Sequence, residues 1–175
     1  KNLMLDINSA EEALTDKTVA IMPTQLNGRT CNMDEIIHFA TKNNLSIFED
    51  AAQALGSKFK NKYAGTFGIA SAISLYPAKI LGCLGDGGAI LTNDSDVYEK
   101  IILLRDHGRD PVSGEVISWG FNSRLDNIQA AFLNYFFSKY DEVILKRRFF
   151  AQLYDEGLNE IEEIYLPEPP NNGDH

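Results

Sequence analysis

The sequence has few cysteines and no long hydrophobic run. Cys31 and Cys83 lie far apart among the 175 residues, without histidines at metal-ligand spacing, so neither a disulfide framework nor a metal site is predicted. No stretch approaches the roughly 20 apolar residues that span a bilayer, and no signal-peptide pattern opens the sequence. We therefore expect a cytoplasmic protein without a membrane partner.

Positive charge is also scarce. The 16 Lys and Arg residues are outnumbered by 25 Asp and Glu residues, which are spread along the chain and give a net charge of −9. A negative surface repels polyanions, so no nucleic-acid partner is expected. With 44% hydrophobic and 23% charged residues, the sequence has the composition of a globular protein with a sizeable core.

Apolar runs typical of strands alternate with helical patterns along the chain. Strands are predicted at residues 1–7, 18–22, 45–48, 70–76 and 89–92, with a small hairpin within residues 53–65 and a long loop over residues 109–124. Helices are predicted to begin near residues 9, 32, 94, 125 and 141. Strands separated by helices indicate βαβ units and a mostly parallel sheet, which is the α/β class.

Two candidate catalytic residues follow two of these strands. Asp50 closes the strand at residues 45–48, and Lys79 lies just past the strand at residues 70–76, in a loop rich in glycine. Because the carboxyl ends of parallel strands share one edge of a sheet, we expect the two side chains to converge there. Such a pair either forms a salt bridge or holds a cofactor, and these residues alone leave both possibilities open.

Pyridoxal phosphate is a cofactor that this pair would suit. It needs a lysine amine for a Schiff base, a carboxylate that keeps its pyridine nitrogen protonated, and donors for its phosphate. Lys79 and Asp50 would supply the first two. Ser74 has a hydroxyl for the phosphate, and Gln53, one turn after Asp50, could donate to the ring oxygen.

Five consecutive blocks of the sequence resemble the DegT/DnrJ family of sugar aminotransferases. They are EDAAQ at residues 49–53, SLYPAK at 74–79, LGCLGDGG at 81–88, LRDHG at 104–108 and GFNSRLDNIQAA at 120–131. The resemblance implies the large domain of a fold type I, aspartate-aminotransferase-like protein, a three-layer α/β/α structure with a mostly parallel sheet. It also implies that residues 1–138 are part of this pyridoxal-phosphate domain, and that residues 139–175 are a helix and linker toward a small C-terminal domain. The family's first segment and that small domain have no counterpart, so we expect a fragment.

The resemblance also implies a role for each candidate residue. By position, Lys79 is the Schiff-base lysine, Asp50 the partner of the pyridine nitrogen, Gln53 a contact to the phenolic oxygen and Ser74 a phosphate ligand. Asn122 matches the asparagine that reaches the phosphate from the neighbouring subunit, so a homodimer is implied.

The implied reaction moves an amino group from an amino acid, glutamate by family analogy, to a nucleotide-linked keto-sugar in amino-sugar and polysaccharide biosynthesis. Two alternatives stay open: a dehydratase of deoxy-sugar synthesis, in whose relatives a histidine tends to replace Lys79, and a catalytically silent interaction domain.

The sequence departs from the family at Gln25, where histidine is common, and at Ile69, where aspartate is common. We expect Gln25 and the loop over residues 109–120 to bear on the choice of substrate.

Overall fold

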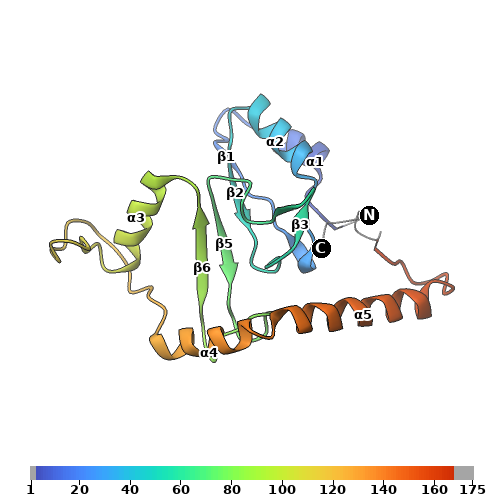
Figure 1. Cartoon of the computed structure of the whole chain (residues 1–175). Coiled ribbons are helices and arrows are strands. Elements are labelled where there is room, and N and C mark those ends of the chain that lie inside the picture. The colour runs from blue at the N-terminus through green and yellow to red at the C-terminus, as the bar shows by residue number, and fades with distance from the viewer. Residues whose placement is uncertain (1–2, 168–175) are drawn as a thin grey trace.

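The computed structural model describes residues 3–167 and shows a mixed α/β fold (Figure 1). The helices of this range are α1 (Ile7–Ala13), α2 (Met33–Lys42), α3 (Ser95–Arg105), α4 (Asn127–Phe137) and α5 (Tyr140–Leu158), with a short 3₁₀ helix at Leu26–Gly28. The strands are β1 (Ala20–Ile21), β2 (Ser46–Asp50), β3 (Lys58–Phe59), β4 (Lys62–Tyr63), β5 (Ala70–Ser74) and β6 (Gly88–Thr92).

Four of the strands form one sheet in the order β1-β2-β5-β6. The strands β1, β2 and β5 run parallel to one another, and β6 is antiparallel to β5. The strands β3 and β4 form a separate antiparallel hairpin in the connection between β2 and β5. The predicted mostly parallel sheet and the predicted small hairpin are therefore confirmed.

One face of the sheet is covered by a helix. Ile21 of β1 and Ile47 of β2 are paired in register, so their side chains point to the same face. There they pack with Met33, Ile36 and Phe39 of α2, which are at most 3% exposed. The helix thus buries its apolar stripe on β1 and β2.

The opposite face is open. Met22, Phe48 and Ile90, from β1, β2 and β6 or their ends, are 66%, 38% and 55% exposed. The register pairs Asp50 with Ala72 and Ala72 with Ile90, which places Asp50 on this same open face. The candidate carboxylate is therefore presented on the accessible side of the sheet.

The N-terminal segment differs from its prediction. Residues 3–6 are not a strand, and residues 1–2 of the predicted strand lie outside the described residues. The carboxylate of Asp6 accepts the backbone N–H groups of Asn8 and Ser9 at 3.4 and 3.2 Å and so caps α1. Because this local cap competes with extended backbone, the helix begins at Ile7, earlier than predicted.

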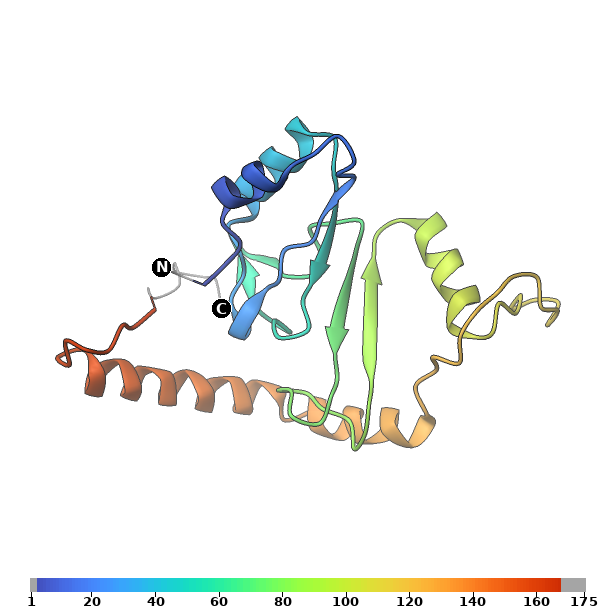
Figure 2. The ribbon, with the colours of Figure 1, turned by 180° about the vertical axis from the view of Figure 1, so that it is seen from behind.

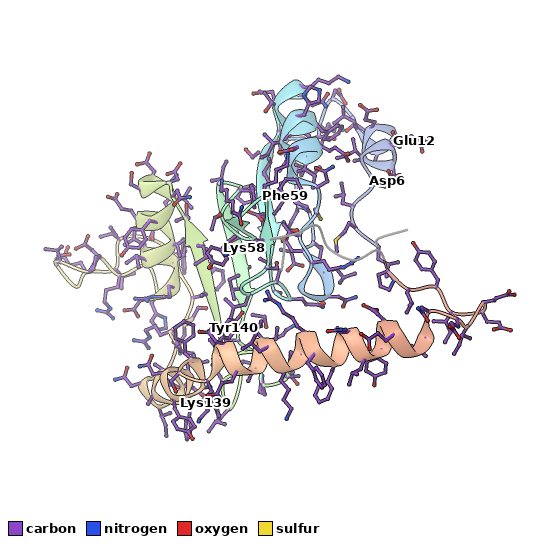
Figure 3. The ribbon with its side chains drawn as sticks, turned by 45° about the vertical axis from the view of Figure 1, so that its right-hand side comes forward. Asp6, Glu12, Lys58, Phe59, Lys139 and Tyr140 are labelled. Carbon is purple, nitrogen blue, oxygen red and sulfur yellow. The ribbon has the colours of Figure 1, made fainter. Side chains whose placement is uncertain are left out.

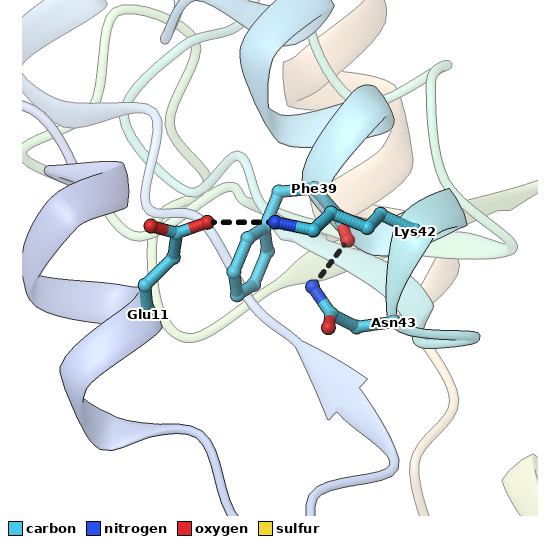
Figure 4. A network of polar contacts seen from close by, with 4 residues as sticks. All are labelled: Glu11, Phe39, Lys42 and Asn43. Carbon is cyan, nitrogen blue, oxygen red and sulfur yellow. Dashed lines mark hydrogen bonds and ion pairs between the residues drawn. The ribbon is translucent and has the colours of Figure 1, made fainter.

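Polar contacts join the first two helices and close the second (Figure 4). The ammonium group of Lys42 on α2 lies 3.3 Å from the Glu11 carboxylate on α1. The side-chain amide of Asn43 donates to the Phe39 carbonyl at 2.9 Å and ends α2. Two predicted N-caps are confirmed: Asn32 caps α2, and Asp94 caps α3, where its carboxylate accepts the Val97 N–H at 3.0 Å.

The last two helices run across the edge of the sheet at which β5 ends and β6 begins (Figures 1 and 2). Leu133 of α4 is buried, whereas α5 has no buried residue and extends beyond the sheet. Tyr140, at the start of α5 (Figure 3), donates its hydroxyl to the Leu55 carbonyl at 2.6 Å. The beginning of α5 is therefore fixed to the segment that follows β2.

Candidate functional site

Asp50 and Ser74 lie at the carboxyl ends of adjacent parallel strands. Asp50 is the last residue of β2 and Ser74 the last of β5. Asp50 is paired with Ala72, and residues two apart on a strand share a face, so the Asp50 and Ser74 side chains both point to the open face. The structure thus brings these two predicted site residues together.

The segments that follow β2 and β5 pack into one apolar cluster together with Leu133 of α4. Buried side chains of the cluster come from both segments: Ala51 and Ala54 follow β2, and Leu75, Leu81 and Cys83 follow β5. Asp50 directly precedes the first of these segments, and Lys79 lies just before Leu81. The backbone that carries the Asp50 carboxylate and the backbone that carries the Lys79 amine are therefore both fixed by this apolar cluster.

The segment that carries Lys79 is folded tightly onto the end of β5. The backbone N–H of Lys79 donates to the Tyr76 carbonyl at 2.8 Å, and the N–H of Leu75 donates to the Gly87 carbonyl at 2.9 Å. A Cβ atom at Gly82 would lie 2.7 Å from the Tyr76 carbonyl oxygen, closer than side chains approach. Gly82 is thus required for a turn that fixes the backbone of Lys79.

Each of three predicted site residues forms a hydrogen bond within the protein and keeps a further hydrogen-bonding group free. Asp50 Oδ1 and Ser74 Oγ each accept a backbone N–H from two residues later, at 3.1 and 3.3 Å. Gln53 Oε1 accepts the backbone N–H of Asn27 at 3.0 Å. Within residues 3–167, Asp50 Oδ2, Gln53 Nε2 and the hydroxyl proton of Ser74 have no protein partner.

These unengaged atoms match the needs of pyridoxal phosphate. A carboxylate oxygen can accept from a pyridinium N–H, an amide N–H can donate to the ring oxygen, and a hydroxyl can donate to the phosphate. The donor and acceptor set around the strand ends therefore fits this cofactor.

Asp50 and Lys79 do not form the salt bridge that the sequence left open. Lys79 is half-buried, and its amine has no ionic or hydrogen-bond partner within the described part of the chain. The ion pairs of that part join Lys42 to Glu11, Lys60 to Asp34 and Arg124 to Asp106. The amine is thus free to react with a ligand.

Asn122 lies in a different part of the fold. It is exposed, forms an isolated antiparallel bridge with Asp106 at the end of α3, and accepts from Arg124 Nη2 at 3.3 Å. No hydrogen bond joins it to the segments after β2 or β5 of its own chain. The structure therefore does not bring Asn122 to the other four predicted residues.

Glu49, to which the sequence assigned no separate role, is the centre of a buried network. Its carboxylate is 2% exposed and accepts from Gln25 Nε2 at 2.9 Å. It also accepts the backbone N–H groups of Gly65, Phe67 and Gly68 at 2.7, 2.6 and 3.1 Å. A buried carboxylate needs such partners. The sequence held one signal, which is a charged residue next to an apolar strand at a position that points to the covered face.

Of the two departures from the family, one has a buried side chain and the other lies at the amino end of a strand. Gln25 has no exposed surface, and its Oε1 accepts the Cys31 N–H at 2.7 Å. Ile69 precedes β5 at its amino end, where its N–H donates to the Ile47 carbonyl at 2.8 Å. We expected Gln25 to bear on the choice of substrate, but its burial excludes direct contact with a substrate in this structure.

A shallow apolar hollow on α5 is lined by Val143, Lys146, Arg147, Phe150, Ala151 and Tyr154. The hollow is not lined by any of the predicted site residues. Among residues 3–167, no three His, Cys, Asp or Glu side chains gather as metal ligands. No helix in that range is both long and apolar enough to cross a membrane.

A mostly parallel sheet with ionisable groups at its carboxyl edge defines an α/β protein with a ligand site at the strand ends. The family of the chain follows from its sequence as a whole. Residues 1–175 match the DegT/DnrJ/EryC1/StrS aminotransferase family. The chain belongs to this family.

Relatives in the family are similar over nearly the whole chain. The sequence is 41% identical over 156 residues to a pleiotropic regulatory protein of Geobacillus stearothermophilus, covering 89% of this chain and 42% of that protein. It is 36% identical over 170 residues to dTDP-3-amino-3,4,6-trideoxy-alpha-D-glucose transaminase of Micromonospora megalomicea, covering 97% and 46%. The chain thus spans less than half the length of these relatives.

Solved structures show the same fold. The X-ray structure of Streptomyces venezuelae DesV, in complex with a ketimine intermediate, superposes with a TM-score of 0.89 at 37% identity, covering 95% of this chain and 45% of that one. The Escherichia coli GDP-4-keto-6-deoxy-D-mannose-3-dehydratase with bound hydrated PLP gives a TM-score of 0.81 at 28% identity, covering 91% and 46%. The predicted fold type I, aminotransferase-like fold is confirmed.

Proposed function

We propose that this chain is part of a pyridoxal-phosphate-dependent aminotransferase. The enzyme moves an amino group from an amino acid, with glutamate as the proposed donor, to a nucleotide-linked keto-sugar. One arrangement carries the proposal: Asp50 and Ser74 end adjacent strands on one open face, and the turn of Lys79 is fixed in the same apolar cluster as the segment after Asp50. Family membership and the sugar transaminase among the relatives support it.

Each proposed site residue has a defined task. Pyridoxal phosphate, when bound, supplies an electron sink for negative charge that develops at the amino-acid carbon. Lys79 would anchor the cofactor through its amine and, once displaced by the incoming amine, would move a proton between the amino-acid carbon and the cofactor carbon as general base and acid. Asp50 Oδ2 would accept from the protonated ring nitrogen, Gln53 Nε2 would donate to the ring oxygen and Ser74 would donate to the phosphate.

A second copy of the chain completes the proposed site. Asn122 is exposed and has no contact with the strand-end residues of its own chain, so we place it at the phosphate of a partner subunit in a homodimer. Large apolar side chains on α4 support such an interface, because Ile128, Tyr135 and Phe137 are 60–66% exposed. The enzyme would act in the cytoplasm.

The proposed division of the chain follows the same scheme. Residues 1–138 would form part of the cofactor domain, and residues 139–175 a helix and linker toward a further domain. The exposed α5 suits such a connection. Residues 168–175 lie outside the described residues.

The test is a titration of the whole protein with pyridoxal phosphate. A visible band distinct from that of free pyridoxal phosphate should appear with the wild-type protein and with Lys100→Ala, a control on the exposed face of α3. This band, which reports the imine with a lysine, should be absent with Lys79→Ala. Transfer of nitrogen to a keto-sugar nucleotide should follow the same order. A band with sugar deoxygenation and no nitrogen transfer would indicate the dehydratase, and no band with the wild-type protein would indicate a silent domain.

A further inference from the structure

We propose that Glu49 and Gln25 are positioning residues for Asp50, so that a buried carboxylate–amide pair on the covered face of the sheet sets the direction of the carboxylate on the open face. This inference rests on the proposed function and deepens it. Neither side chain lies on the open face, since Gln25 is 0% and Glu49 is 2% exposed.

The first step is the opposite direction of two neighbouring side chains. Glu49 and Asp50 are consecutive residues of β2, and consecutive strand residues point to opposite faces. The Glu49 carboxylate is held from below by the backbone N–H groups of Gly65, Phe67 and Gly68. A movement of the end of β2 would therefore have to break these hydrogen bonds of Glu49 on the covered face of the sheet.

The segment that binds Glu49 is itself fixed. Ser71 of β5 donates its hydroxyl to the Gly65 carbonyl at 2.7 Å, and the N–H of Ile69 donates to the Ile47 carbonyl at 2.8 Å. A Cβ atom at Gly68 would lie 2.3 Å from that same Ile47 oxygen. The backbone of residues 65–68 thus lies directly against β2 and cannot follow Glu49 if it moves.

Gln25 joins this network to the backbone of Asp50. The N–H of Gln25 donates to the Asp50 carbonyl at 2.9 Å, and the N–H of Asp50 donates to the Pro23 carbonyl at 3.1 Å. The Gln25 side chain donates to Glu49 at 2.9 Å and accepts from Cys31 N–H at 2.7 Å. Residues 23–25 therefore bind both the N–H and the carbonyl of Asp50, and the Gln25 side chain ties this segment to Glu49.

The chemistry of Gln25 makes the inference specific. A glutamine amide has a donor for Glu49 and an acceptor for the Cys31 N–H, and a neutral histidine ring also offers one of each. Leucine has a similar volume and neither group. Loss of the polar pair should therefore misplace Asp50, whereas a histidine should keep it in place.

The experiment compares four variants of the whole protein: Glu49→Gln, Gln25→Leu, Gln25→His and Phe39→Leu. Phe39 is buried in the core that Gln25 borders, and its replacement removes packing without touching the polar network. Three quantities are measured: the affinity for pyridoxal phosphate, the pH profile of its visible band, and backbone hydrogen exchange of residues 50–52 without cofactor. The visible band changes with the proton on the imine nitrogen, and the ease of losing that proton depends on the charge that Asp50 stabilises on the ring nitrogen. A purely structural role of Glu49 and Gln25 would not shift this pH profile.

Glu49→Gln and Gln25→Leu should weaken cofactor binding about tenfold or more, the size of effect seen when metal ligands lose their orienting partners. They should also shift the pH profile and speed exchange at residues 50–52. Gln25→His and Phe39→Leu should bind within about threefold of wild type, a difference of less than about 1 kcal/mol. If Glu49→Gln does not fold, the comparison of Gln25→Leu with Gln25→His tests the inference by itself.

Wild-type affinity, pH profile and exchange in Gln25→Leu would overturn the inference and leave the proposed function intact. Equal losses in Phe39→Leu would also overturn it, because the effect would then follow general stability. A wild-type protein that binds no pyridoxal phosphate would overturn the proposed function, and the inference with it.

Discussion

Replacement of Gly68 by alanine should destabilise the protein strongly, because the new methyl group has no room. Its Cβ would lie 2.3 Å from the Ile47 oxygen and 2.8 Å from the Ile47 carbonyl carbon, whereas ordinary contacts begin at 3.4 Å. The neighbours are backbone atoms of β2 and not the end of a flexible side chain. Residues 68–69 therefore have to move away from β2 by about 1 Å.

Such a movement has a cost that can be worked from the local contacts. It breaks the bond from Ile69 N–H to Ile47, now 2.8 Å, and the bond from Gly68 N–H to Glu49, now 3.1 Å. Overpacking costs about 1–3 kcal/mol, and each lost hydrogen bond about 1 kcal/mol. We expect a loss of about 4 kcal/mol, a large share of a typical free energy of unfolding.

The assay is urea unfolding of the whole protein followed by far-UV circular dichroism, with Gly157→Ala as the matched control. Gly157 lies within α5 and has no atom within 4 Å of its added Cβ. The control should be as stable as wild type or gain up to about 1 kcal/mol, because alanine favours helix over glycine. A loss below about 1 kcal/mol in Gly68→Ala would refute the claim that residues 65–68 lie fixed against β2.

Two further predictions concern other parts of the fold. Tyr140→Phe removes the hydroxyl bond to the Leu55 carbonyl and should lower the free energy of unfolding by about 1 kcal/mol in the same urea assay, and an unchanged value would show that α5 is not held there. Burial raises the pKa of the Cys31 and Cys83 thiols. Both should therefore resist alkylation in the native state. Because the unfolded chain loses these protons first, stability should fall as the pH rises above about 8.5, the usual thiol range; rapid native alkylation of either thiol would contradict their burial.

Local signals in the sequence were sufficient for most of the fold. Asn32 and Asp94 predicted the beginnings of α2 and α3, and the apolar runs predicted the strands of the sheet. At the N-terminus the prediction was wrong, because Asp6 forms an Asx cap that outweighs the strand preference of the apolar residues around it. Periodicity could not show the antiparallel direction of β6, whose connection to β5 over residues 75–87 contains no crossover helix.

The candidate site was predictable only in part. The rule that ligands bind at the carboxyl ends of parallel strands predicted that Asp50 and Lys79 converge. The structure places Asp50 and Ser74 on one open face and packs the segments that carry Asp50 and Lys79 into one apolar cluster, and the convergence of the two side chains on a cofactor stays a prediction. The burial of Gln25 could not be predicted, because its hydrogen-bond partners Glu49 and Cys31 are brought to it only when the chain folds. Long-range hydrogen bonds of this kind have no periodic signature.

Chemical trapping of the cofactor would test most directly whether Lys79 and Asp50 hold one pyridoxal phosphate. The whole protein is loaded with the cofactor, reduced with borohydride to fix any imine, digested and mapped by mass spectrometry. The label should lie on the peptide that contains Lys79, at a level that falls in Asp50→Ala. A label on another lysine, or none on a protein that is folded, would contradict the proposed site.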